Sequence, residues 1–276
     1  MKLSRSENMN ILTEQIVLLG AVSKSNKYLP FDKCVPYKNL LISPIKLKDI
    51  YDVQEILNIL QIDKNNLGQI ELISMSKLRF ILITILSEEK FQQELYTLLY
   101  KSLSISDDDI IEYYMNDDTE YLVIGQKIYG HDIIDADTAI TITSEDFDEI
   151  VRIILYQNII DYTDKYVDPD VKRAYEEYQR LKNKNGVKIS IEHKINCVQL
   201  KTGMTREEIG NLTIRNFIQL FDILVDESDY VAAKTAEFNG VKFKSPIEHW
   251  AYKAHKDKYA EAFCDADAFI DKVQSV

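Results

Sequence analysis

The residues best suited to chemistry form a short acidic cluster in the middle of the chain. His131 and Asp132 are followed by Asp135 and Asp137, and imidazole and carboxylate groups are common metal ligands. A calcium loop that begins at Asp135 would need a ligand where Ala139 stands, and the glycine that such a loop requires next is also missing. We therefore interpret the cluster as a polar turn between two strands and expect no metal there.

Other catalytic patterns fail on their spacing. Gly125 and Gly130 have the four-residue gap of a P-loop, but His131-Asp132 replaces the Lys-Ser/Thr pair that would contact phosphate. No nucleophile elbow, dinucleotide fingerprint or Cys–His dyad is discernible from spacing. Asp107 and Asp109 resemble a DxD metal motif, although acidic residues also suit a helix N-terminus, and we predict a helix there. We expect no catalytic residues and no cofactor.

The histidines and cysteines do not form a zinc site. His249 and His255 are six residues apart, which is about 240° around a helix, so they do not share a face with each other. Cys264 adds no plausible ligand set. The three cysteines, Cys34, Cys197 and Cys264, are far apart and odd in number, which favours reduced, buried thiols in a cytoplasmic protein over disulfides.

The charge of the chain argues against nucleic-acid binding. The formal net charge is −12, and affinity for the phosphate backbone comes largely from Lys and Arg. One basic stretch, from Val171 to Lys188, contains six cations and is interrupted by Glu176 and Glu177. A solvated helix whose cations gather near its C-terminus explains this stretch, so we expect no nucleic-acid partner.

The apolar stretches of the sequence indicate where in the cell the protein is expected. Polar residues interrupt the apolar stretch from Ile11 to Val22, so we expect no cleaved signal peptide. The most apolar run, Phe80 to Leu86, is too short to span a bilayer. These patterns predict a cytoplasmic protein without a membrane partner.

The elements that carry these residues are expected to be mostly helical. Only eight Gly and five Pro interrupt the chain, and apolar positions recur at helical spacing through most of it. Three prolines between 27 and 44 exclude a helix and predict extended chain at 39–42 and 45–47, as a small hairpin or as edge strands. The segment 119–143 predicts a β-meander with strands at 120–124, 127–129 and 139–143, because β-branched and aromatic residues alternate there with Gly turns. Thr143-Ser144-Glu145-Asp146 is a helix-start signal. The predicted fold is mainly α with a small β-meander or hairpin (α+β) and a helical bundle-like architecture.

Three segments follow from this organisation. They are an N-terminal helix or arm over 1–27, a helical domain with the small β element over 28–185, and a C-terminal helical subdomain over 186–276. Further helices are predicted at 11–22, on either side of a break near Ser87, and after Asp168-Pro169. Another follows a capping box at Thr205, with an apolar stripe from Ile214 to Val225, and a final one begins at Pro246 after a turn at Asn239-Gly240. In the last helix Trp250 is expected to be a buried anchor.

Five stretches, in this order, resemble a family of tail-assembly and virion-associated proteins from tailed phages of low-GC Gram-positive bacteria. They lie between Tyr28 and Trp250 and read LPFDKCVPYKNLLISPIKLKD, ELISMSKLRFIL, TSEDFDEIVRIILYQN, KINCVQLKTGMTREEIGNLTIRNFIQLFDIL and IEHW. The resemblance implies a non-catalytic protein that binds other phage structural or assembly proteins, with self-association also open. A longer meander near 131–137 and a longer C-terminal helix after Trp250 depart from the family. They leave open whether the protein is an assembly chaperone, confined to the host cytoplasm, or a component of the virion.

The C-terminal helix is the predicted partner-binding element. Its apolar stripe, flanked by acidic residues, consists of Phe263, Ala266, Phe269, Ile270 and Val273. Such a helix either docks on its own core or binds in a groove of another subunit or protein. A phage-encoded intracellular enzyme and a DNA-associated protein remain the alternatives in other functional classes.

Overall fold

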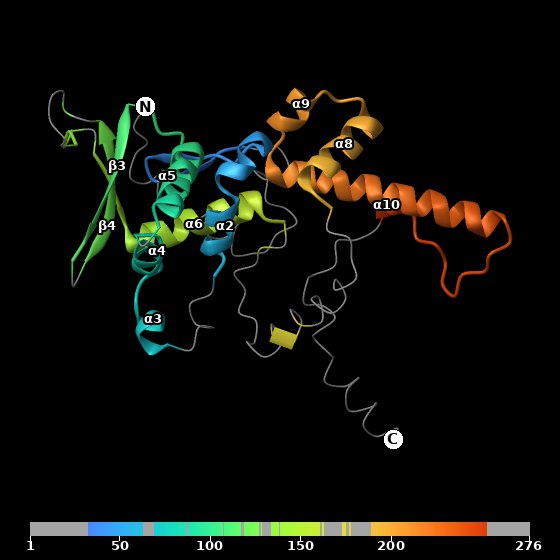
Figure 1. The fold of residues 1–276 in the computed structure, drawn as a ribbon, viewed down its shortest axis with the longest axis horizontal. Coiled ribbons are helices and arrows are strands. Elements are labelled where there is room, and N and C mark those ends of the chain that lie inside the picture. The colour runs from blue at the N-terminus through green and yellow to red at the C-terminus, as the bar shows by residue number, and fades with distance from the viewer. Residues whose placement is uncertain are drawn as a thin grey trace, which may run out of the picture. The chain divides into compact units, whose positions relative to one another are not determined.

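The computed structural model describes residues 33–62, 69–86, 88–106, 108–116, 119–126, 128, 134–137, 139–160, 162, 173–174, 177 and 189–252. The chain is mainly helical and carries two small antiparallel sheets, which confirms the predicted fold class (Figure 1). It divides into two compact units, one formed by 1–164 with 207–217 and the other by 165–206 with 218–276. No helix within the described ranges is long and apolar enough to cross a membrane.

The described part of the first unit has a hairpin where the prolines predicted extended chain, but 45–47, predicted as one of its strands, pair with 212–214 instead. Strand β1 (Val35–Tyr37) pairs antiparallel with β2 (Leu40–Ile42), and Lys38 takes the left-handed conformation in the turn. Contrary to expectation, the thiol of Cys34 beside this hairpin is exposed, and it lies 3.1 Å from the Ser43 hydroxyl.

Helices follow where the apolar stripes predicted them. The 3-10 helix η2 (Leu47–Asp52) leads into α2 (Gln54–Leu60), and α4 (Lys77–Leu86) and α5 (Glu89–Leu103) are separated near residue 87 as expected. The sequence did not predict the short α3 (Ile70–Ser74). No side chain at Val53 caps α2. Instead, the buried Glu94 of α5 accepts a hydrogen bond from the Ile56 amide at 3.1 Å, which supplies an acceptor at the N-terminus of α2.

Asp109, the last residue of the acidic run, begins a strand, so the predicted helix there is wrong. Strand β3 (Asp109–Met115) pairs along its whole length with β4 (Glu120–Gln126), and β4 pairs with β5 (Ile140–Thr143). The β-branched and aromatic residues after Asp109 suit this pairing better than a helix. Strands β4 and β5 fall in the predicted meander, whereas its expected middle strand at 127–129 is not a strand in the part that is described.

Helix α6 (Ser144–Asn158) begins as the helix-start signal predicted and forms the centre of the first unit. Thr143 and Asp146 form a capping box, each side chain bonding the other's backbone N–H. Among the buried apolar residues of α6, Phe147 and Ile150 are fully enclosed. Helix α6 packs against α2, α4, β2 and β5.

Two buried amides at the end of α6 fix the neighbouring chain. The Asn158 side chain accepts a bond from the Ile45 amide at 2.9 Å and donates one to the Ile154 carbonyl at 2.8 Å. Gln157 donates to the Ile42 carbonyl at 2.9 Å. Buried backbone groups need hydrogen-bond partners. The two side-chain amides supply these partners to the backbone of Ile42 and Ile45.

The later segment 207–217 completes the first unit. Residues 45–47 pair with 212–214, where Leu47 donates to the Leu212 carbonyl and Ile214 to the Ile45 carbonyl, at 2.8 and 3.1 Å. Arg215 donates to two carbonyls at the C-terminus of α6, those of Tyr156 and Ile159. Cations at this end of a helix are favoured by its dipole.

The remaining described helices are divided between the two units, because 207–217 belongs to the first unit. Helix α8 (Ile191–Thr202) ends at Gly203, whose φ of 75° permits the left-handed turn. Helix α9 (Arg206–Asn211) starts directly after Thr205, and α10 (Ile214–Phe238) begins in the first unit and continues in the second. The predicted turn at Asn239-Gly240 ends α10.

The helix predicted from Pro246 is wrong. Residues 246–249 have no regular structure, and the described part of the chain ends in the short 3-10 helix η4 (Trp250–Tyr252). Trp250 is half-buried instead of enclosed, and its ring stacks on that of His249. The helix predicted at 11–22 lies outside the described residues, and of the helix predicted after Asp168-Pro169 only 173–174 and 177 are described, all of them helical.

Candidate functional site

The predicted C-terminal binding stripe lies outside the described residues, so its role remains a prediction. The same holds for His131, Asp132 and most of the basic stretch at 171–188. Asp135 and Asp137 are described, and the Asp135 carboxylate accepts a bond from the Asp137 amide at 3.0 Å, as in a polar turn. Across the described ranges, no group of three or more His, Cys, Asp and Glu side chains could hold a metal ion.

One titratable cluster in the first unit has perturbed pKa values. Burial alone would raise the pKa of Asp146, but hydrogen bonds from Lys38 and Tyr37 outweigh it and hold that pKa below its usual value. Burial and the bond to Asp146 raise the pKa of Tyr37, so its hydroxyl stays protonated and donates at 2.8 Å. Since the Asp146 carboxylate also caps α6, its oxygens are used structurally.

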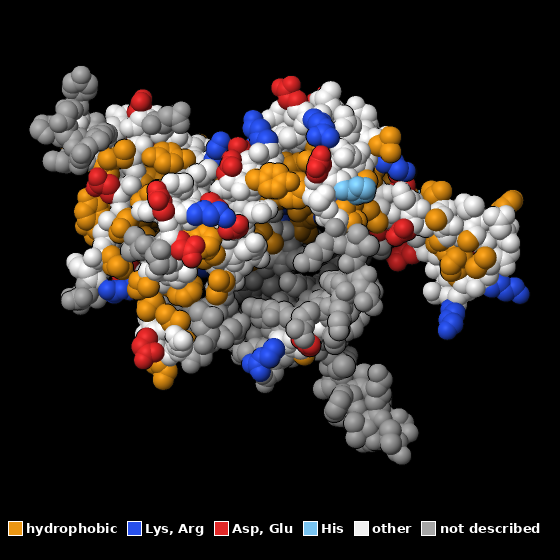
Figure 2. All heavy atoms as spheres, viewed as in Figure 1, with side chains coloured by type: hydrophobic (Ala, Val, Ile, Leu, Met, Phe, Trp, Pro, Cys, Tyr) orange, Lys and Arg blue, Asp and Glu red, His pale blue; other side chains and the backbone are white. Residues whose placement is uncertain are grey.

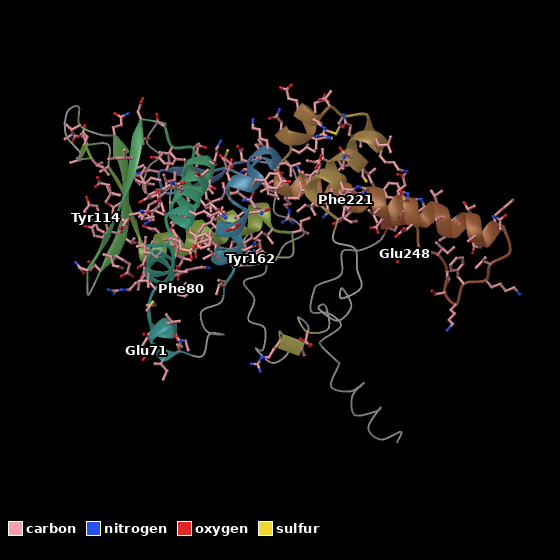
Figure 3. The ribbon with its side chains drawn as sticks, in the orientation of Figure 1. Glu71, Phe80, Tyr114, Tyr162, Phe221 and Glu248 are labelled. Atoms are coloured by element: carbon pink, nitrogen blue, oxygen red, sulfur yellow. The ribbon has the colours of Figure 1, made fainter. Side chains whose placement is uncertain are left out.

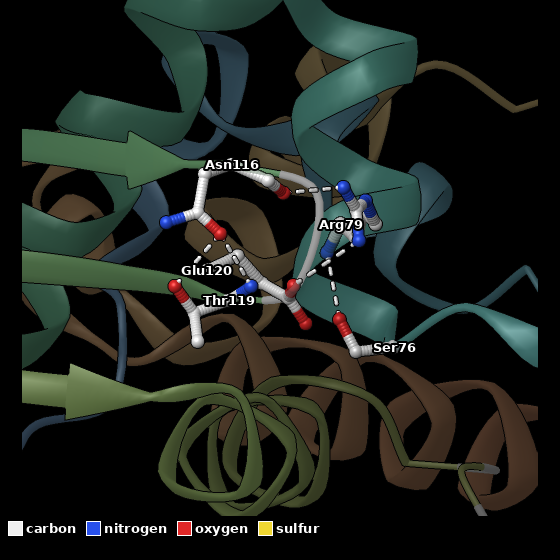
Figure 4. Close-up of polar contacts among 5 residues, drawn as sticks. All are labelled: Ser76, Arg79, Asn116, Thr119 and Glu120. Atoms are coloured by element: carbon white, nitrogen blue, oxygen red, sulfur yellow. Dashed lines mark hydrogen bonds and ion pairs between the residues drawn. The ribbon is translucent and has the colours of Figure 1, made fainter.

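A second polar group ties α4 to the β3–β4 hairpin (Figure 4). The Arg79 guanidinium donates to the Asn116 carbonyl at 2.5 Å and lies 3.7 Å from the Glu120 carboxylate. The Asn116 amide oxygen in turn accepts bonds from the backbone and hydroxyl of Thr119. These contacts close a hairpin and position no nucleophile or general base, so we assign them a structural role.

The more informative surface lies on α10. Apolar residues recur along it with the 3-and-4 spacing of a heptad repeat, starting with Ile214, Phe217 and Phe221. The same positions continue as a line that we call the seam, formed by Leu224, Ser228, Val231, Thr235 and Phe238. One helix face therefore carries a continuous set of core-type positions for its whole length.

Burial along this face changes between the two ends of the helix. Phe217 is 1% exposed, and Phe221 is 8% exposed with the Lys194 ammonium of α8 lying 5.1 Å from its ring (Figure 3). Val231 is 55% and Phe238 is 93% exposed. The second half of α10 thus has core-type residues on its surface.

The two hydroxyl residues of the seam do not make it strongly polar. Ser228 donates to the Leu224 carbonyl and Thr235 to the Val231 carbonyl, both at 2.8 Å. Because each hydroxyl hydrogen is already bonded within the helix, an apolar partner can cover these residues without stranding a donor. The seam is therefore suited to burial.

An aromatic group lies on a different side of the helix. The loop 239–252 returns beside α10, and its His249 ring lies 4.7 Å from Tyr230 and 5.6 Å from both Trp250 and Tyr252 (Figure 1). Tyr230 is about 130° around the helix from the middle of the seam, at 100° per residue. Within the described residues, this loop therefore leaves the seam uncovered.

The described part of the second unit exposes more large apolar side chains than it buries. Over 189–206 and 218–252, only Val198 and Phe221 are buried hydrophobic residues. Figure 2 shows hydrophobic side chains gathered over the end of α10 and the following loop, where Phe238, Val241 and Phe243 are exposed. Such grouping of exposed apolar side chains is typical of an interaction surface.

Sequence reasoning missed this surface, although it recognised the helix. The stripe was predicted only as far as Val225, and continuing the heptad count to Val231 and Phe238 would have extended it. The exposure itself has no signal in the sequence, because Phe217 and Phe238 occupy equivalent positions of the repeat.

Comparisons with known proteins return no relationship. No family model, curated protein or solved structure matches the chain.

Proposed function

We propose that this chain is a non-catalytic protein that binds other proteins, and that the seam and the exposed end of α10 form its binding surface. In line with the resemblance of its sequence motifs, we propose that its partners are structural or assembly proteins of a phage tail, encountered in the host cytoplasm or in the virion. One observation carries the proposal: a regular apolar helix face is buried at Phe217 and exposed at Val231 and Phe238.

The energetics favour association at this face. Covering apolar surface contributes roughly 25 cal/mol per Å², and Phe238 keeps 93% of its side-chain exposure when the chain is alone. Large aromatic residues are typical anchors of protein interfaces. The helix is already formed in the folded chain, so binding does not require its ordering.

The positions of the charged residues around the seam indicate what kind of surface a partner presents. Four of the five acidic residues of α10 lie away from the seam, at Asp222, Asp226, Asp229 and Glu237. They keep the remaining helix surface solvated, as in other helices with one apolar face. A partner is therefore expected to present an apolar groove or helix of matching length.

The proposal is tested by affinity capture of the tagged full-length chain from cells that produce it with its neighbouring genes. We expect specific proteins to co-purify with the wild type and to be lost with the double variant Val231→Glu/Phe238→Glu. Leu200→Glu is the matched control, because Leu200 is 86% exposed on α8 and is not in the seam. Equal capture by all three chains would contradict the assignment of the surface.

A further inference from the structure

We infer that the seam is occupied by the seam of a second copy of this chain, packed antiparallel. The inference rests on the proposed function, because it names the occupant of the same surface. It follows from the pattern of residue sizes and charges along α10, which is complementary to itself when one helix is reversed.

The sizes match in two layers of the core. In an antiparallel pair, positions of one type in the heptad face positions of the other type. With the two-fold axis between Asp229 and Tyr230, Ser228 faces Val231 of the partner subunit, and Leu224 faces Thr235 of the partner subunit. Each layer therefore combines a smaller hydroxyl residue with a larger aliphatic one, and symmetry repeats both layers.

The flanking charges match in the same register. Glu227 and Lys234 are the two charged residues beside the seam, each one position before a seam residue. The register that forms the layers brings Glu227 next to Lys234 of the partner subunit, and symmetry repeats this pair. Within one chain, Lys234 pairs with Glu237 at 2.8 Å, and its side chain is 43% exposed, so it is accessible to a partner.

The remaining groups on this half of α10 allow the approach. The loop 239–252 contacts Tyr230, which lies well away from the seam. The outward acidic residues face solvent, and their mutual repulsion is screened beyond about 8 Å at physiological salt. The shared seam from Leu224 to Thr235 is about 18 Å long at 1.5 Å per residue, so the interface is small and the dimer is expected to be weak.

Charge reversal tests the register directly. Glu227→Lys places two lysines together at each symmetric pair, and Lys234→Glu places two glutamates together. An exposed ion pair changes an association constant by about twofold, so turning two attractions into two repulsions should weaken the dimer roughly tenfold. An equimolar mixture of the two variants restores both pairs, because each chain then meets the opposite charge.

The measurement is sedimentation equilibrium of the full-length chain up to its highest soluble concentration. We expect a wild-type dimer, weaker dimers for each single variant, and recovery in the mixture. Glu237→Lys is the control, since it breaks the same intrahelical pair with Lys234 without changing the flanks of the seam. Val231→Glu should remove the dimer altogether.

Three outcomes would overturn the inference: a wild-type chain that stays monomeric, a dimer unaffected by Val231→Glu, or single variants that are not rescued by mixing. A monomeric chain whose captured partners are still lost with Val231→Glu/Phe238→Glu would overturn the self-pairing and leave the proposed function standing. If Val231→Glu removed the dimer and the wild-type chain captured no other protein, the self-pairing would be supported.

Discussion

Two phenylalanines on one helix allow the exposure of α10 to be tested energetically. Phe217 is 1% exposed and Phe238 is 93% exposed, although both occupy the same position of the repeat. Phe217→Ala removes a buried ring and leaves a cavity, so it should lower the free energy of unfolding by about 3–5 kcal/mol. Phe238→Ala removes an exposed ring and should change the unfolding free energy by less than about 0.5 kcal/mol.

The comparison is internally controlled. Both substitutions replace Phe by Ala in α10, so the difference in helix propensity largely cancels between them. Urea unfolding followed by circular dichroism, at a concentration low enough to keep the chain monomeric, gives the two midpoints. If Phe238→Ala cost more than about 1 kcal/mol in this assay, the ring would be covered within the monomer, and the seam would not be a free surface.

Three further predictions concern the first unit and the loop. Because the pKa of Asp146 is lowered in the folded chain, its stabilising contribution is complete above its usual value of 3.8 and is lost as the pH falls through the folded-state pKa; acid unfolding curves of Asp146→Asn should therefore lose part of their pH dependence below about pH 4. Asn158→Ala leaves the buried Ile45 amide without its acceptor and should destabilise the chain by about 1–3 kcal/mol, whereas the exposed Asn211→Ala should cost less than about 0.5 kcal/mol by thermal unfolding. Trp250→Ala should cost only about 1 kcal/mol, and the native Trp emission should be partly quenched by acrylamide, because this ring is half-buried; a fully protected emission would contradict this placement.

Local signals in the sequence predicted the elements whose formation depends on local contacts. The capping box at Thr143 and Asp146 involves residues three positions apart, so it is readable directly, and it starts α6 as expected. The prolines around β1 and β2 exclude a helix for covalent reasons, and a hairpin is present.

The misassigned elements depend on distant partners. Asp109 begins a strand because the following residues pair with β4, and acidic residues before an apolar run look the same in either case. Pro246 suits a helix start, yet the chain there runs beside Tyr230 with His249 against its ring. Pairing and packing of this kind are decided by the fold and not by the local sequence.

The candidate surface could be predicted only in part. The heptad spacing of α10 follows from the sequence, but a buried and an exposed repeat look alike until the neighbouring elements are placed. Helix α8 covers Phe221, as the position of Lys194 over its ring shows. Among the described residues, no buried hydrophobic side chain follows Phe221 on α10.

Hydrogen exchange measured with and without association tests the central claim most directly. Amides of 224–238 should exchange quickly in the dilute chain, because an uncovered helix end opens locally, and should slow when the chain is concentrated or bound to a captured partner. Amides of α2 should not change. The seam would not be the binding surface if association left the exchange rates of 224–238 unchanged and slowed exchange elsewhere. One such place is the sheet around Tyr114 (Figure 3), whose ring stacks on that of Tyr121.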